Sequence, residues 1–168
     1  FIEVIKEIYD EDPDRIACYD TKKKLHFCIE TEDFNVVHID STISYTKERQ
    51  RDLILGMEEV MNVLKQVNTQ KTTIILTHYS YDFLTRSEQN MMCNLLMDYN
   101  VQLWIAGHEH DDLLRKQRDY FYEFQCGNLI YEGADTKSCI AIGEMDSVNG
   151  KGSVTIHYWD SPNGWALY

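Results

Sequence analysis

The sequence predicts an α/β fold with mixed sheets, and three observations support that class. Short apolar runs rich in β-branched and aromatic residues recur along the chain, as strands require. Two longer stretches, near residues 48–67 and 88–99, instead have apolar residues at the spacing of an amphipathic helix. With 168 residues, 43% of them hydrophobic, the chain can bury one sizeable core, so we expect residues 1–168 to form a single domain.

The N-terminal part of the chain predicts a helix end followed by a hairpin. Residues 1–9 carry isoleucines at helical spacing and read as the end of a helix that begins upstream. The acidic run 10–14 predicts a solvated loop. The apolar runs 25–29 and 34–40 predict two strands, and the polar residues 31–33 between them suit a hairpin turn.

The middle of the chain predicts a β-α-β unit. Residues 72–76 and 101–105 read as strands, and Ser87 is a suitable N-cap for the helix over 88–99 between them. Two strands joined in this way are expected to be parallel, with a right-handed crossover. The preceding helix over 48–67 has an apolar stripe made of Leu53, Met57, Val60, Met61 and Leu64.

The C-terminal part predicts a change to antiparallel structure. A polar connector is expected at 111–116, and strands are expected over 120–126, 138–144 and 153–159. Asparagine and glycine at 149–152 predict a hairpin turn between the last two of these strands.

The charge and cysteine content restrict the function classes. A net charge of −12 argues against binding to nucleic acid or to an anionic membrane, because phosphate groups attract Lys and Arg. No apolar run is long enough for a transmembrane helix, and no signal peptide is visible. The five cysteines are odd in number, widely spaced and without a Cys-x-x-Cys pair, so they predict reduced thiols of a cytoplasmic protein rather than a Cys-based zinc site.

Three histidines follow the two strands of the β-α-β unit. His78 comes just after strand 72–76, and His108 and His110 come just after strand 101–105 in the sequence Gly107-His108-Glu109-His110. The carboxyl ends of parallel strands meet at one edge of a sheet, so we expect the three imidazoles to converge there. Gly107 is expected to give the backbone a conformation closed to other residues.

Neutral imidazoles are ligands for Zn, Mn and Fe, so this edge is a predicted metal site. A single histidine at a strand end is more often hydrogen-bonded than metal-bound, and the prediction depends on the three occurring together. Tyr79, Tyr81 and Phe83 flank His78, where a packing role is expected.

The same residues resemble the calcineurin-like metallophosphoesterase family. Leu76-Thr77-His78-Tyr79-Ser80 is similar to the family's strand-histidine motif, and residues 107–110 are similar to its Gly-His-x-His motif. The strand over 36–41 resembles the strand that follows the family's Gly-Asn-His motif. The resemblance covers the chain as the C-terminal half of the family's domain, which implies half of a four-layer α/β/β/α sandwich.

The resemblance implies a metal-dependent phosphoesterase, a hydrolase with two divalent metal ions among Mn, Fe, Zn, Ni or Co. His78 and His108 would ligate the second ion and His110 the first. The substrate would be a phosphorylated small molecule or protein. The family's Asp-x-His, Gly-Asp-x-x-Asp and Gly-Asn-His motifs do not occur here, so a missing N-terminal half would supply the remaining ligands.

We therefore expect this chain alone to bind metal weakly and to hydrolyse phosphoesters poorly or not at all. A half-domain is also expected to expose a sheet edge and an apolar face, which favours association. Nearby acids are further candidates for contact with metal, although such acids more often support a ligand than act as one; they are Asp40, Asp82, Asp111 and Asp112.

Two other functions compete with a phosphoesterase. The first is a degenerate phosphoesterase-like binding module that retains the shape without the chemistry. The second is a metallohydrolase of the metallo-β-lactamase type, which uses His-x-His-x-Asp-His. Here residues 108–112 contain no histidine after the acids, so this alternative is the weaker of the two.

Overall fold

The computed structural model describes residues 25–48, 50–110, 113–117, 119–127, 138–160 and 164–167, which form an α/β fold with two sheets. This confirms the predicted fold class. The larger sheet contains β1 (His26–Glu30), β2 (Phe34–Ile39), β3 (Thr72–Leu76), β4 (Val101–Ala106), β5 (Leu113–Gln117) and β6 (Phe121–Gln125). The smaller sheet contains β7 (Cys139–Asp146), β8 (Lys151–Asp160) and β9 (Gly164–Leu167). The predictions for residues 1–9, 10–14 and Cys18 lie outside the described residues.

The six-stranded sheet has the order β1-β2-β3-β4-β6-β5. Its four central strands are parallel to one another, and β1 and β5 are antiparallel strands at its two edges. The β-α-β unit is present as predicted, because β3 and β4 are parallel neighbours joined through helix α3 (Arg86–Asp98). The carboxyl ends of β3 and β4 therefore lie at the same edge of the sheet.

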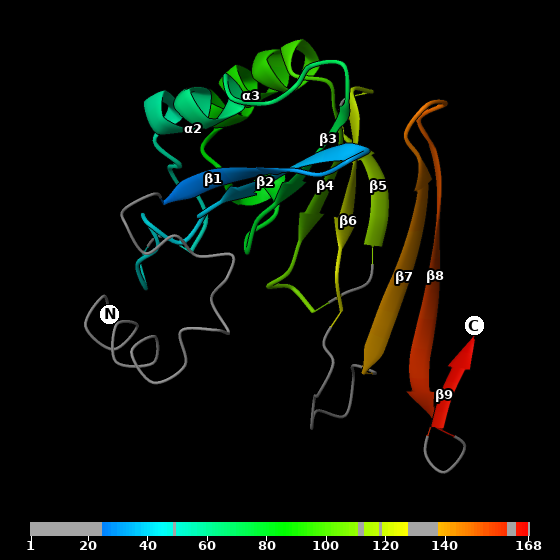
Figure 1. Ribbon diagram of the computed structural model, residues 1–168. Helices are drawn as coiled ribbons and strands as arrows, with labels where there is room; N and C mark the ends of the chain where they lie inside the picture. The colour runs from blue at the N-terminus through cyan, green and yellow to red at the C-terminus, as the bar shows by residue number, and fades with distance from the viewer. Residues whose placement is uncertain are drawn as a thin grey trace, which may run out of the picture.

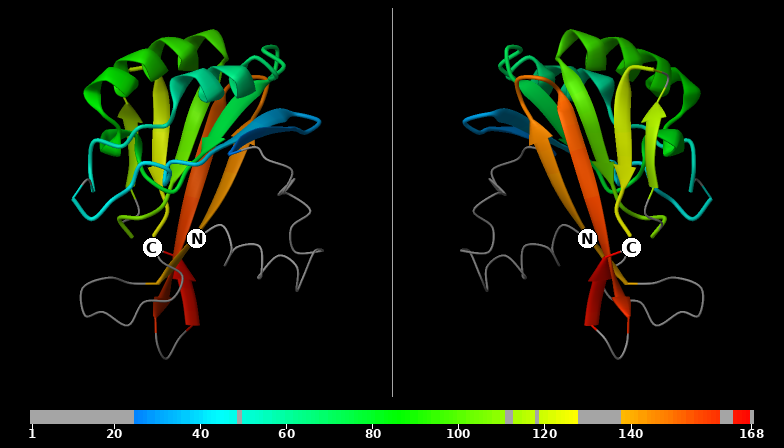
Figure 2. Two further views of the ribbon diagram at one scale, coloured as in Figure 1. Left: turned by 90° about the vertical axis from the view of Figure 1, so that its left-hand side faces the viewer. Right: turned by 90° about the vertical axis from the view of Figure 1, so that its right-hand side faces the viewer.

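Helices α2 (Met57–Leu64) and α3 lie on one side of the six-stranded sheet, and the smaller sheet lies on the other (Figures 1 and 2). Helices α2 and α3 cover one face, and the core beneath them includes Ile75 and Trp104, which are fully buried. The β7–β8 hairpin stands on the other side. These layers, α/β/β, match the expected partial sandwich. No helix in the described part of the chain has the length and apolar character to cross a membrane.

The first predicted helix is much shorter than expected. It begins at Met57 instead of residue 48, because Gly56 has a left-handed backbone with φ of 79° and interrupts the helical conformation. Leu53 was expected on the apolar face of this helix. It is fully buried, but it lies in an extended segment that forms a β-bridge with Leu84. Its backbone N–H donates to the carbonyl of Phe83 over 2.8 Å, so the segment before α2 is tied to the loop after His78.

Helix α3 begins two residues earlier than expected, and Ser87 is not its N-cap. Thr85 caps it, since its hydroxyl oxygen accepts the backbone N–H of Glu88 over 3.3 Å. The Glu88 carboxylate is buried and accepts the backbone N–H of Leu55 over 2.6 Å.

The region after β4 also differs from the prediction. The expected polar connector over 111–116 contains strand β5, and β6 pairs with β4 in parallel, so the tail is not antiparallel throughout. Strand β5 has two leucines followed by three polar residues, so its sequence lacks the alternation or apolar run that would predict a strand. The antiparallel arrangement was correct for β7 and β8, whose hairpin turns at residues 147–150. Strand β9 was not predicted.

The outer face of the smaller sheet is apolar and exposed. Its strand register places Ile140 with Leu167, and Trp159 with Trp165, on one face. Ile142 on the same face is 55% exposed. We call these five side chains the outer apolar face.

Candidate metal centre

His78 and His108 lie next to each other at the carboxyl edge of the large sheet. The Nδ1 atom of His108 is 3.3 Å from the Nε2 atom of His78, and the two ring centroids are 5.1 Å apart. The loops that carry them are joined by backbone hydrogen bonds. The N–H of Gly107 donates to the carbonyl of His78 over 3.0 Å, and the N–H of Thr77 donates to the carbonyl of Ile105 over 3.0 Å.

The spacing of the two ring nitrogens suits a shared metal ion. Two nitrogen ligands about 2.0–2.1 Å from one tetrahedral ion lie roughly 3.3–3.4 Å apart, which follows from the tetrahedral angle. The nitrogens of His78 and His108 have this separation. The distance between the two nitrogens is therefore compatible with one shared metal ion.

The surroundings favour the neutral form of both imidazoles. Burial lowers the pKa of His78, and the neighbouring His110 lowers it further, while Asp40 opposes this shift. Burial also lowers the pKa of His108, with His78 as the next cause. Metal ions bind the neutral imidazole, so a lowered pKa keeps both side chains in the ligand form near neutral pH.

His110 lies near the pair without joining it. It is exposed, and it is close enough to lower the pKa of both other histidines. Across the residues that the structure describes, no group of three or more His, Cys, Asp or Glu side chains converges on one point. Asp111 and Asp112, which follow His110, lie outside those residues.

The two histidines of the Gly-His-x-His sequence have an unusual backbone. His108 has φ of 70° and His110 has φ of 59°, in the left-handed region that residues other than glycine rarely adopt. Gly107 has no positive φ, and a Cβ there would meet only ordinary contacts with His78, so the role expected for this glycine is wrong. Strained residues of this kind are concentrated at functional sites, since the surrounding structure must hold them in place.

Aromatic rings surround His108. The ring of Tyr79 is 4.3 Å and that of Phe83 5.3 Å from the His108 ring, measured between centroids. Tyr45 stacks on Tyr79, with ring centroids 5.5 Å apart. These rings restrict the orientation of the imidazole. Tyr81 instead packs in the core against Trp104, in the packing role expected from the sequence.

Two of the acids considered from the sequence have other partners. The Asp40 carboxylate accepts the backbone N–H of Thr42 over 2.9 Å and its hydroxyl over 2.7 Å. Asp82 forms an ion pair with Arg115 over 2.9 Å.

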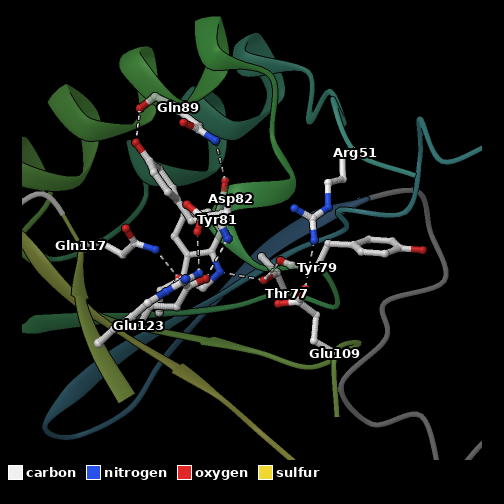
Figure 3. Close-up of polar contacts among 11 residues, drawn as sticks. Arg51, Thr77, Tyr79, Tyr81, Asp82, Gln89, Glu109, Gln117 and Glu123 are labelled. Carbon is white, nitrogen blue, oxygen red and sulfur yellow. Dashed lines mark hydrogen bonds and ion pairs between the residues drawn. The ribbon is translucent and has the colours of Figure 1, made fainter. Parts of the chain in front are cut away.

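A buried glutamate supports the loop after His78. Glu123 in β6 is fully buried, and its carboxylate accepts the backbone N–H of Tyr81 over 2.7 Å (Figure 3). The same carboxylate accepts hydrogen bonds from Arg115 over 2.8 and 2.9 Å, and from Gln117. Glu123 thereby anchors the segment whose Tyr79 and Phe83 contact His108. A glutamate inside an aromatic strand was the only sequence signal for this role.

Comparison with known proteins supports the metallophosphoesterase resemblance at a distance. No family model matches this chain. It is similar to the "Uncharacterized metallophosphoesterase-like protein YydB" of Bacillus subtilis, with 22% identity over 170 residues, covering 95% of this chain and 35% of the relative. The chain thus spans about a third of that protein. A solved structure titled "GAP50 the anchor in the inner membrane complex of Plasmodium" is 16% identical, with a TM-score of 0.40, and the alignment covers 84% of this chain and 47% of that one.

Proposed function

We propose that this chain supplies the histidine ligands of a two-metal phosphoesterase centre within a longer protein. The observation that carries the proposal is the 3.3 Å separation of the His78 and His108 nitrogens at the carboxyl edge of parallel strands. The distant similarity to a metallophosphoesterase-like protein supports it independently. The substrate is a phosphorylated small molecule or protein.

The three histidines divide between two ions in this proposal. His78 and His108 hold one divalent ion, and His110 holds the other. The ions are Mn, Fe, Zn, Ni or Co, since sites of mixed imidazole and carboxylate ligands accept several of these metals. When bound, two such ions supply a Lewis acid for the phosphoryl oxygens and an activated water.

The residues of this chain position the ligands. Tyr79 and Phe83 restrict the ring of His108, and the hydrogen bond from Gly107 to His78 holds the two loops together. Three imidazoles without a bridging carboxylate bind two ions weakly. The chain alone therefore has low metal affinity and little or no hydrolytic activity, and the longer protein supplies the other ligands.

The test uses the longer protein that contains this chain. Substitution of His108→Ala removes one of two paired ligands, so hydrolysis of p-nitrophenyl phosphate should fall at least a hundredfold with little change in unfolding. Cobalt titration followed by visible absorption reports ligand binding without reference to activity. Lys65→Ala is the control, because Lys65 is exposed between the end of α2 and the start of β3, away from the carboxyl edge.

Two results would contradict the proposal. If His108→Ala retained both cobalt absorption and hydrolysis, the ligand assignment would be wrong. If the unsubstituted protein bound cobalt without hydrolysing any phosphoester, the alternative of a non-catalytic binding module would be favoured. That alternative is consistent with the lack of a third converging ligand among the described residues.

A further inference from the structure

A cleft of about 680 Å³ opens beside His108. Its walls come from the irregular segment before α2, from the loop after His78 and from the turn after β4. Among the described residues, Lys47 and Arg51 are its cations, and Phe83, His108 and Glu109 form the side nearest the candidate metal ligands. The cleft therefore connects the candidate metal centre with a segment that the proposed function leaves without a role.

Arg51 is held in this cleft by two contacts. Its guanidinium carbon lies 4.9 Å above the ring of Phe83, and the ring of Phe83 in turn contacts His108. One guanidinium nitrogen is 3.4 Å from a carboxylate oxygen of Glu109. Figure 3 shows Arg51 pointing toward Glu109. A guanidinium over an aromatic face is attracted to it and restricted in orientation.

Most of the hydrogen-bonding capacity of Arg51 remains available. Its side chain is 70% exposed, and 3.4 Å is long for a charge-assisted hydrogen bond, which is about 2.7–2.9 Å. An exposed ion pair of this kind contributes little stability, so another anion can replace the Glu109 carboxylate at small cost. The planar guanidinium then offers paired N–H groups, which match the oxygen atoms of a phosphate or carboxylate.

The charges in the cleft limit how Arg51 can act. Glu48 and Asp52 also line it, so among the lining residues that the structure describes the cations are not in excess over the carboxylates. Attraction of an anion from a distance is therefore weak, and recognition depends on direct hydrogen bonds. The position of Arg51, one aromatic ring away from His108, suits a group attached to the substrate and not the phosphoryl group at the metal centre.

We propose that Arg51 is a specificity-determining residue that binds a second anionic group on the substrate. This inference rests on the proposed function, and it assigns the substrate class as phosphoesters that carry a further phosphate or carboxylate. In the absence of substrate Arg51 pairs with the Glu109 carboxylate, and the anionic group of the substrate replaces that carboxylate when it binds. Lys47 lines the same cleft and adds a second cation.

The binding test compares inorganic pyrophosphate with inorganic phosphate. Calorimetry on the metal-loaded longer protein, freed of excess metal, should show that Arg51→Ala weakens pyrophosphate binding about tenfold and phosphate binding less than twofold. Arg51→Lys should restore only part of the affinity, since an ammonium group lacks the paired donors. Glu109→Gln should strengthen pyrophosphate binding, because the competing charge is removed.

The kinetic test separates this inference from the proposed function. Arg51→Ala should raise KM for O-phosphoserine, a phosphoester that also carries a carboxylate, about tenfold, while kcat and the KM for p-nitrophenyl phosphate stay nearly constant. Lys65→Ala is again the control for loss of one positive charge. Equal effects of Arg51→Ala on both substrates, or on both anions, would overturn the inference even in an active enzyme. If the protein has no phosphoesterase activity but pyrophosphate binding depends on Arg51, the proposed function fails and the anion site stands.

Discussion

Substitution of Glu123→Gln tests how the candidate site is supported from the core. In the native structure one carboxylate oxygen accepts the backbone N–H of Tyr81, and the other accepts donors from Arg115 and Gln117. A glutamine of the same shape has one oxygen and one NH₂ group. Whichever way the amide is turned, its NH₂ group faces another donor, so at least one buried donor loses its acceptor.

The magnitude follows from the burial of these groups. A hydrogen bond to a charged group contributes about 1.5–3 kcal/mol, and breaking a buried ion pair costs about 3–5 kcal/mol. Arg115 is 30% exposed and keeps its ion pair with Asp82, so the cost should be near the lower end of that range. We expect Glu123→Gln to lower the free energy of unfolding by about 3 kcal/mol.

Urea unfolding followed by circular dichroism measures this change. With a urea dependence of about 2 kcal/mol per molar for a chain of this size, the midpoint should fall by roughly 1.5 M. Glu144→Gln is the matched control, since Glu144 lies in the exposed part of strand β7 and should change the free energy by less than about 0.5 kcal/mol. Equal midpoints for the two variants would refute the view that Glu123 anchors the loop after His78.

Three further predictions concern pH, the start of α2 and the outer apolar face. Burial lowers the pKa of His38, so the imidazole binds a proton more readily in the unfolded chain than in the folded one. The free energy of unfolding should therefore be full above about pH 6.5 and decline below it. His38→Gln should make this decline less steep when the free energy is measured by urea unfolding at each pH. Gly56→Ala should destabilise the chain by about 1 kcal/mol in thermal unfolding, because its φ of 79° is strained for alanine although nothing lies within 4 Å of an added Cβ; an unchanged melting temperature would contradict this. Ile142→Lys should reduce concentration-dependent association in sedimentation velocity, since this side chain is 55% exposed within an apolar face, and an unchanged sedimentation coefficient across concentrations would argue against association there.

The elements nearest the candidate metal centre could be predicted because their signals are local. Strand β3 has the predicted bounds, and β4 extends one residue beyond them, because each is rich in β-branched and apolar residues and is followed by polar ones. The helical crossover between them favours parallel strands, and this connection brings the loops of His78 and His108 to one edge. The pairing of these two histidines thus follows from sequence order and simple topology.

Other features depend on contacts between distant parts of the chain. Strand β5 forms because β6 offers it an edge, and its own residues are too polar to indicate a strand. The buried carboxylate of Glu123 is stabilised by hydrogen bonds from Tyr81, Arg115 and Gln117, which lie outside its own strand.

The sequence by itself determined the fold class, the parallel strands and the edge at which the histidines gather. The tertiary structure decided that a ring nitrogen of His78 lies 3.3 Å from one of His108, and that Arg51 lies over Phe83. The physical reason is the sequence distance over which each signal acts. Hydrophobic periodicity involves residues only a few positions apart, so it can be recognised in the sequence. The direction of a side chain at a loop depends on backbone strain and on packing partners that only the folded chain brings together.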